Sequence, residues 1–214
     1  MARTLYTILL WLALPVLGIR LALRAAKNPG YRSRIAERFG GAGGDCVPCE
    51  LWIHAVSVGE VNAATPVVQS VLRRNPSIRI LITTMTPTGA SRVIDTFGPS
   101  VVHRYAPYDY PFAIRRFLER FRPKLLVLME TEIWPNMIAL CHHRQIAVAM
   151  ANVRLSAKSA RGYQMIRPLI QDALQKVSAF AAQSQADKDN LLRLGVDPTK
   201  VLKTGSTKFE IEMA

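Results

Sequence analysis

This 214-residue sequence contains few cysteines and few acidic residues. Its three cysteines are an odd number, which argues against a disulfide framework, and Cys46 and Cys49 lack the second CxxC pair that a zinc site needs. Only 15 Asp and Glu residues balance 28 Lys and Arg residues, so the net charge is +13. Half of the residues are apolar, which excludes a disordered chain. The charge predicts a polyanionic partner: nucleic acid, an anionic membrane or a phosphorylated substrate.

The N-terminus carries an apolar run from Thr4 to Ile19, sixteen residues without a charge. About 20 residues are needed to span a bilayer, so residues 1–23 are expected to form either a short span or an interfacial helix. Residues 1–38 hold seven basic residues and one acid, and most of these charges follow the apolar run. A cleaved signal peptide, the alternative, would carry its positive charges before that run.

This order of apolar and basic residues favours an uncleaved anchor over residues 1–23, followed by a basic juxtamembrane segment over 24–45. The positive-inside rule then places the rest of the chain at the cytoplasmic face of the membrane. An anionic membrane surface is therefore the expected polyanion, and nucleic acid is not expected as a partner.

Beyond a glycine-rich stretch at 40–44, short apolar runs alternate with amphipathic stretches. The runs that read as buried strands are 51–56, 78–83, 101–105, 124–129, 146–151, 179–182 and 201–204. The stretches of helix length are 60–74, 87–97, 110–121, 134–144, 157–176 and 185–194. Buried apolar strands that alternate with helices are typical of a parallel sheet covered on both faces. We predict an α/β fold with a doubly wound, mainly parallel, Rossmann-like sheet over residues 46–204.

In such a fold, ligands bind beyond the carboxyl ends of the strands. The segments that follow the predicted strands are rich in hydroxyl groups, small residues, carboxylates and cations, which suits a hydroxyl-rich ligand with negative charge. The candidate positions are Ser57, Gly59, Glu60, Thr84, Thr86, Thr88, Gly89, Glu130, Glu132, Asn152, Arg154, Ser156 and Lys208.

The motif Ser57-x-x-Glu60 has two interpretations. It matches a capping box, in which Glu60 bonds to the backbone at the start of its own helix. Alternatively, Glu60 is a general base that faces a cleft and reaches an acceptor hydroxyl. Gly59 slightly favours the second interpretation, because it allows a ligand to approach the backbone closely.

The other candidates also have structural alternatives. Thr86 before Pro87, and Ser156 before the stretch 157–176, match helix N-caps. The surplus of hydroxyl groups around Thr86 fits a sugar or an anion at a helix N-terminus. Arg154 is a candidate phosphate or carboxylate ligand. Glu130 and Glu132 suit either hydrogen bonds to sugar hydroxyls and helix amides or, less simply, a metal ion.

Five motifs in order along the chain resemble the 3-deoxy-D-manno-octulosonic acid (Kdo) transferases of lipopolysaccharide biosynthesis. They are HAVSVGE (54–60), TTMTPTG (83–89), METEIWPN (129–136), ANVRLSAKS (151–159) and TGSTKF (204–209). The resemblance implies an inverting, metal-independent glycosyltransferase of GT-B architecture that needs no cofactor. It implies Glu60 as general base, with Glu130 and Lys208 stabilising the transition state, and leaves the other candidate positions for acceptor binding.

The resemblance also implies the partners: CMP-Kdo as donor and the lipid A precursor, lipid IVA, as acceptor. In the family the donor is bound mainly by a second domain, and residues 205–214 match the start of the linker to it. We therefore expect the chain to be inactive by itself, with the donor-binding half absent. Two other functions stay open: a non-catalytic module that binds anionic lipid at a membrane surface, and a GT-B enzyme that uses another sugar nucleotide.

Overall fold

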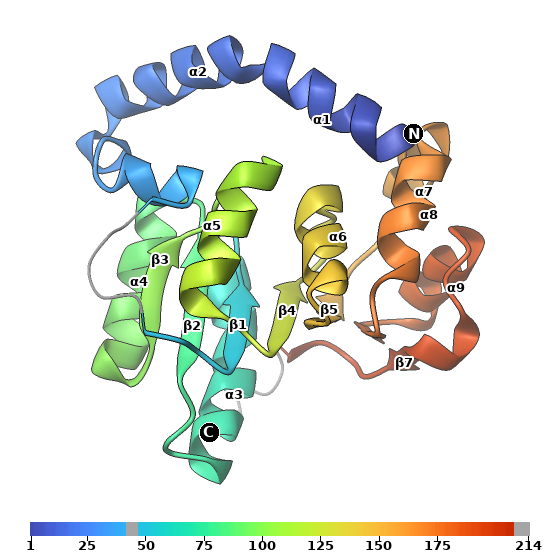
Figure 1. The fold of residues 1–214 in the computed structure, drawn as a ribbon. Coiled ribbons are helices and arrows are strands. Elements are labelled where there is room, and N and C mark those ends of the chain that lie inside the picture. Colours follow the sequence, from blue (N-terminus) through green and yellow to red (C-terminus); the bar gives the residue numbers. More distant parts are fainter. Residues whose placement is uncertain (42–46, 208–214) are drawn as a thin grey trace.

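A computed structural model describes residues 1–41 and 47–207 of the chain. Within this part, seven parallel strands form one sheet in the order β3-β2-β1-β4-β5-β6-β7 (Figure 1). The strands are β1 (Leu51–His54), β2 (Ile80–Thr84), β3 (Val102–Tyr105), β4 (Leu125–Met129), β5 (Ala147–Val153), β6 (Ala179–Ala182) and β7 (Val201–Lys203). The doubly wound, Rossmann-like sheet predicted from the apolar runs is confirmed.

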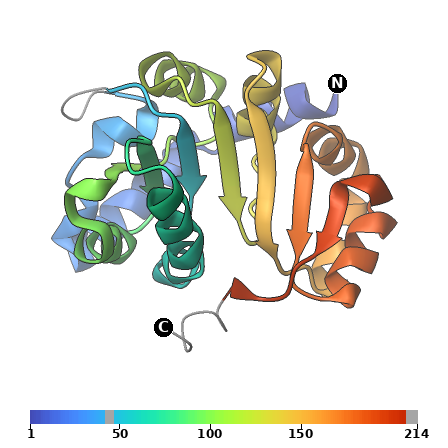
Figure 2. The same ribbon diagram turned by 90° about the horizontal axis from the view of Figure 1, so that it is seen from below.

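Helices cover the sheet on both sides (Figure 2). One face carries α3 (Val58–Arg74) and α4 (Pro87–Phe97), and the other carries α5 (Pro111–Phe121), α6 (Pro135–His143), α8 (Arg167–Gln175) and α9 (Gln185–Arg193). Side chains alternate along a strand, so Trp52 and Ile53 of β1 enter opposite core clusters. The two faces follow from right-handed crossovers that run outward from β1 to β3 and then return to β4 beside β1.

The stretch predicted as one helix over 157–176 is two helices in the structure. The first, α7 (Ala157–Met165), ends at Ile166, and α8 starts at Arg167 with Pro168 in its first turn. A proline has no amide hydrogen to continue the helical ladder, and its ring clashes with the preceding turn. Pro168 is the sequence signal for this break, which the apolar pattern by itself does not show.

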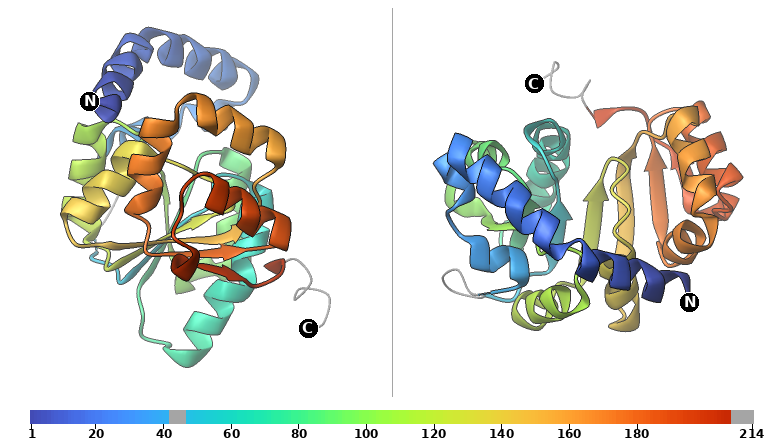
Figure 3. Two further views of the ribbon diagram at one scale, coloured as in Figure 1. Left: turned by 90° about the vertical axis from the view of Figure 1, so that its right-hand side faces the viewer. Right: turned by 90° about the horizontal axis from the view of Figure 1, so that it is seen from above.

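The N-terminal residues form α1 (Ala2–Leu12) and α2 (Leu14–Lys27), which meet at an angle of 51°. They arch over the carboxyl edge of the sheet (Figure 3, right). No single helix in the described part has the length and hydropathy of a membrane span, although α1 and α2 meet that test as a bent pair. The Tyr6 hydroxyl donates to Asp109 Oδ2 at 2.9 Å and the Tyr110 hydroxyl to the Leu10 carbonyl at 2.7 Å, so the pair is bonded to the domain.

Part of the predicted basic segment is packed into the domain. It forms two short 3-10 helices, η1 (Pro29–Tyr31) and η2 (Ile35–Phe39), and η2 contacts α5 and β3. Glu37 is 4% exposed, forms an ion pair with Arg34 at 2.7 Å and accepts a hydrogen bond from the Tyr105 amide at 2.8 Å. Partners of this kind are what a buried carboxylate requires. Arg34 also donates from Nη2 to the His103 carbonyl of β3 at 2.9 Å, so this cation of the predicted juxtamembrane segment is bonded to the domain.

Candidate functional site

The topological switch point of the sheet lies between β1 and β4. These strands are neighbours, but β1 leads into α3 on one face and β4 leads toward α6 on the other. The crevice between two such connections is where open α/β sheets bind ligands. Glu60 lies in the first turn of α3, and Glu130 and Glu132 follow β4. The fold thus brings the three carboxylates that the motifs singled out to one crevice.

The Glu60 side chain is folded back toward its own loop. Its Oε2 accepts a hydrogen bond from the Val56 amide at 2.8 Å, its Oε1 accepts one from the Ser57 hydroxyl at 3.1 Å, and the residue is 7% exposed. Ser57 is the N-cap residue of α3 but caps none of its amides, so the reciprocal bonds of a capping box are not formed. A carboxylate can accept about four hydrogen bonds, so Glu60 keeps acceptor capacity.

The electrostatics of the crevice favour a protonated Glu60. The pKa of Glu60 is raised to about 7 as a net effect: burial raises it most, the carboxylates of Glu132 and Glu130 also raise it, and the bonds from Val56 and Ser57 lower it. Burial also raises the pKa of Glu132, whose Oε2 accepts a hydrogen bond from Trp134 Nε1 at 2.8 Å. A carboxyl group that titrates near neutrality can take up and release a proton at physiological pH, which is the property of a general base.

Backbone strain gathers at the ends of β4 and β5. Glu130 and Asn152 both have a φ of 56°, in the left-handed region that residues other than glycine seldom adopt. The Glu130 amide donates to the Ala151 carbonyl at 2.9 Å, and Asn152 Oδ1 accepts from the Thr207 amide at 3.3 Å. Strained residues cluster at functional sites. Thr207 comes directly before Lys208, which lies outside the described residues.

Most of the predicted hydroxyl ligands have structural partners. Thr86 is the N-cap of α4 and accepts from the Gly89 amide at 3.1 Å, and Thr88 donates to Thr86 at 3.3 Å. Thr84 has no exposed surface and shares a hydrogen bond of 2.9 Å with His103. For Thr84 and Thr86 the capping and packing roles are visible in the structure, while contact with an acceptor stays a prediction.

The remaining candidate residues also divide into those with a structural partner and those that are open to a ligand. Ser156 is the N-cap of α7 and accepts from the Ser159 amide at 3.1 Å. Arg154 is exposed, and its carbonyl oxygen accepts a hydrogen bond from the Thr131 hydroxyl at 2.6 Å. Apart from its chain neighbours and the backbone of its own helix, a Cβ atom on Gly59 would meet only the Ser57 hydroxyl, at 3.8 Å, so the backbone there is open to a ligand.

The motifs missed a group of residues beside Glu60. A cavity under α2 is lined by Val56, whose amide holds the Glu60 carboxylate, and by Arg20, Arg24 and Arg38. Arg20 and Arg24 are four residues apart, which puts them on one face of a helix. That spacing was the available signal, but it does not reveal that the helix turns this face toward the strand ends.

Residues 1–41 and 47–207 contain no group of three or more His, Cys, Asp or Glu side chains placed to hold a metal ion. Of the CxxC pair, Cys46 lies outside the described residues. Burial raises the pKa of the Cys49 thiol to about 12, so it stays a protonated core residue.

Comparison with known proteins confirms the family. The family model of 3-deoxy-D-manno-octulosonic-acid transferase matches residues 33–211. The chain belongs to the Kdo transferase family. The 3-deoxy-D-manno-octulosonic acid transferase of Haemophilus influenzae is 43% identical over 99% of this chain and 50% of its own length, and that of Bordetella pertussis is 33% identical over 100% and 51%. The chain therefore spans about half the length of these curated Kdo transferases.

Solved structures extend the comparison of the fold. The UDP-GlcNAc 2-epimerase from Neisseria meningitidis superposes with a TM-score of 0.57 at 16% identity, covering 77% of this chain and 48% of the epimerase. The UDP-GlcNAc 2-epimerase from Methanocaldococcus jannaschii gives a TM-score of 0.57 at 16% identity, covering 77% and 47%. At such identities the likeness shows the Rossmann-like fold alone.

Proposed function

We propose that this chain is the acceptor-binding half of an inverting glycosyltransferase that transfers Kdo from CMP-Kdo to the lipid A precursor, lipid IVA. One observation carries the proposal. The buried carboxylate of Glu60 lies at the switch point of the sheet with a pKa near 7, next to Glu130 and Glu132. A helix cap needs no such shift, because a capping carboxylate is stabilised in its charged form by the amides it binds.

In the proposed mechanism Glu60 takes the proton of a glucosamine hydroxyl as its oxygen attacks the anomeric carbon of Kdo. The new C–O bond forms on the face opposite the phosphate, and the bond from the anomeric carbon to the phosphate oxygen breaks. The electron pair leaves with CMP, so the configuration is inverted. Lys208 is proposed to stabilise the charge on the departing phosphate and Glu130 the positive anomeric centre, in a reaction without a metal ion.

The proposed place of action is the cytoplasmic face of the inner membrane. Apolar side chains on α1 and α2 are exposed at Ile8, Leu12, Val16, Ile19 and Leu23, while the exposed Leu5 and Leu9 line a pocket with Pro168 and Leu169 of α8. The bonds from Tyr6 and Tyr110 hold the opposite side of the pair over the strand ends. An apolar outer face of this kind suits burial in lipid, and it would keep the crevice beside a membrane-bound acceptor.

The test is a chimaera in which residues 1–211 replace the matching half of the H. influenzae relative, assayed with CMP-Kdo and lipid IVA. We expect Glu60→Gln to lower kcat by at least about 100-fold with acceptor binding retained, since a positioned base contributes on that order. Glu119→Gln, an exposed carboxylate on α5, is the matched control and keeps its rate. The isolated chain of 214 residues is expected to transfer no Kdo.

An unchanged rate in the Glu60→Gln chimaera would remove Glu60 from the mechanism. If the chimaera transfers no sugar at all while the chain still binds vesicles, the rival function gains support, namely a non-catalytic module at an anionic membrane surface. A chimaera that accepts a different sugar nucleotide in place of CMP-Kdo would refute the proposed donor.

A further inference from the structure

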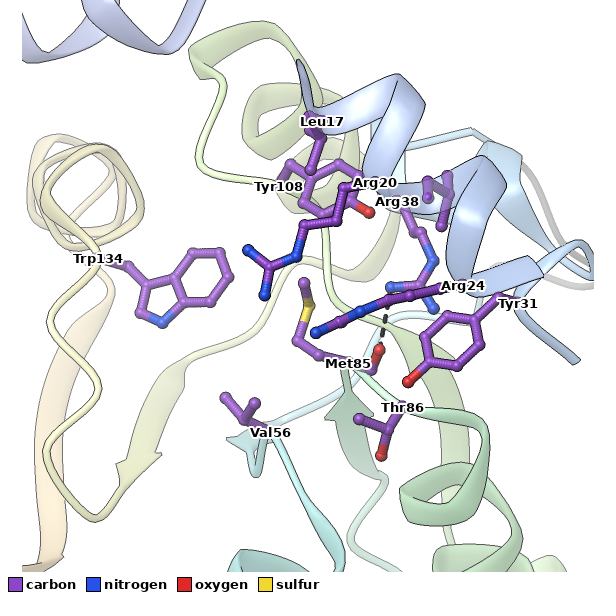
Figure 4. Close-up of a pocket in the computed structure, with 11 residues that line it drawn as sticks. Leu17, Arg20, Arg24, Tyr31, Arg38, Val56, Met85, Thr86, Tyr108 and Trp134 are labelled. Atoms are coloured by element: carbon purple, nitrogen blue, oxygen red, sulfur yellow. Dashed lines mark hydrogen bonds between the residues drawn. The ribbon is translucent and has the colours of Figure 1, made fainter. Parts of the chain in front are cut away.

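A cavity of about 360 Å³ lies between α2, the η1–η2 segment and the carboxyl ends of β1 and β2 (Figure 4). The residues that line it are Leu17, Arg20, Leu21, Arg24, Tyr31, Arg38, Val56, Met85, Thr86, Tyr108 and Trp134. Three of these side chains are cationic, and none is acidic. The site is therefore a concentration of positive charge enclosed by aromatic and apolar walls.

Arg38 is the buried member of this group, with 1% of its surface exposed. Its Nη1 donates to the Met85 carbonyl at 3.2 Å, and its guanidinium lies 4.2 Å from the centre of the Tyr105 ring. Its Nε and Nη2 are buried and have no hydrogen-bond acceptor among residues 1–41 and 47–207. Buried donors are nearly always bonded, and these two adjacent donors form the fork that binds two oxygens of one phosphate.

Arg20 and Arg24 supply the outer part of the site. Both are exposed residues of α2, one helical turn apart, and their side chains extend toward Met85 together with Arg38 (Figure 4). Arg24 also lies over the Tyr31 ring, 5.8 Å from its centre. Within the described chain neither has an acidic ion-pair partner. Three like charges around one cavity repel each other, and an anion with more than one charge would reverse that repulsion.

We propose that Arg20, Arg24 and Arg38 form a binding site for a phosphomonoester group. The inference rests on the proposed function in one respect: the group is taken to be carried by the acceptor. Val56 lines the cavity and its amide donates to Glu60, so one residue connects the arginine cavity to the proposed base. Held in that way, the phosphate would orient the neighbouring sugar hydroxyl toward Glu60.

A second cavity, also of about 360 Å³, continues from the first beneath α1 and α2. It shares Leu17, Tyr108 and Trp134 with the arginine cavity, and apolar side chains form much of its lining. A ligand that joins a phosphate to apolar chains would fill both cavities. A lipid headgroup has this chemistry, whereas free phosphate would occupy the first cavity alone.

The experiment measures binding of the full chain to phosphatidylcholine vesicles that contain phosphatidic acid, a phosphomonoester. Vesicles with phosphatidylglycerol, a phosphodiester, are matched to them in total charge. The test variant is Arg20→Gln/Arg24→Gln, at exposed positions that leave the core unchanged. The matched control is Lys27→Gln, which removes a cation of α2 outside the cavity lining. Arg38→Lys keeps the charge of the buried position but removes the two-donor fork.

We expect Arg20→Gln/Arg24→Gln to weaken binding to phosphatidic acid vesicles at least about tenfold, and Lys27→Gln less than about twofold. Arg38→Lys should lose affinity for phosphatidic acid with little change on phosphatidylglycerol. If Arg38→Lys does not fold, the double variant decides the matter. Equal losses for Lys27→Gln, or equal losses on the two kinds of vesicle, would overturn the site, because general membrane electrostatics would then explain the binding.

Competition with inorganic phosphate distinguishes free phosphate from a lipid headgroup as the source of the bound phosphate group. Competition by inorganic phosphate against the vesicles supports a site that takes free phosphate. Arginine-dependent binding without such competition supports a lipid headgroup.

In the chimaera, Arg20→Gln/Arg24→Gln should raise the KM for the acceptor and leave kcat largely unchanged, unlike Glu60→Gln. Loss of vesicle binding in the arginine variant, together with a chimaera that transfers no Kdo, would refute the proposed function but keep the phosphate site. Unchanged vesicle binding in the arginine variant, together with Kdo transfer by the chimaera, would refute the phosphate site alone.

Discussion

Replacing Glu60 by glutamine should stabilise the fold above neutral pH. In the folded chain burial raises the pKa of Glu60 from 4.5 to about 7. The unfolded chain therefore loses this proton first as the pH rises, and the wild-type protein loses stability between pH 4.5 and about pH 7. Glutamine has the same shape, still accepts from the Val56 amide and carries no charge to desolvate.

The shift in the pKa of Glu60 sets the size of the expected change in the free energy of unfolding. A difference of about 2.5 pKa units corresponds to about 3 kcal/mol at 1.36 kcal/mol per unit, as an upper value. Above pH 7 the Glu60→Gln protein should exceed the wild type by up to about 3 kcal/mol in free energy of unfolding. Below pH 4.5, where Glu60 is protonated in both states, the two proteins should differ by less than about 1 kcal/mol.

Urea unfolding followed by circular dichroism, repeated across this pH range, measures the difference. Glu119→Gln is the control for removing a carboxylate from the surface of α5. Contributions from Asp109, whose pKa burial also raises to about 7, are common to both proteins and cancel in the difference. The reasoning is refuted if the difference between Glu60→Gln and the wild type does not grow from acid to neutral pH, or if glutamine is the less stable residue throughout.

Three further variants test the fold by their free energies of unfolding in urea. Gly40→Ala should lose at least about 1 kcal/mol, because φ is +71° and the new Cβ would lie 2.2 Å from the Ala113 carbonyl, whereas Gly162→Ala, in an open helical position, should gain up to about 1 kcal/mol. Trp52→Ala should lose about 3–5 kcal/mol, because the fully buried indole leaves a cavity. An unchanged midpoint in any of these variants would contradict the packing described for that residue.

The fold was largely predictable because parallel strands buried on both faces are continuous apolar runs. Every predicted strand is found, and β5 extends from 147 to 153 where the apolar run suggested an end at 151. The extension consists of Asn152 and Val153, and the backbone torsions of Asn152 lie in the left-handed region. A polar residue with unusual backbone torsions inside a strand depends on its neighbours in β6 and after β7, which a local pattern does not contain.

The site was predictable in position but not in detail. Parallel strands end at the same edge, so the motifs after β1 and β4 could be expected to meet. The hydrogen-bond partners of the individual side chains could not be predicted. Ser57 donates to Glu60 where the motif suggested a cap, and Thr84 is bonded to His103 below the surface. Such choices depend on burial by elements far away in the sequence.

By itself the sequence determined the parallel sheet, the order of its strand-end motifs and membership of a family, because periodicity and motif spacing are properties of the chain alone. Only the tertiary structure decided that Glu60 is buried beside Glu130 and Glu132, and that this burial moves its pKa toward neutrality. It also decided that Arg20 and Arg24 turn toward Arg38 over the strand ends. Desolvation and charge clustering arise from residues distant in the chain, so they exist only once the chain has folded.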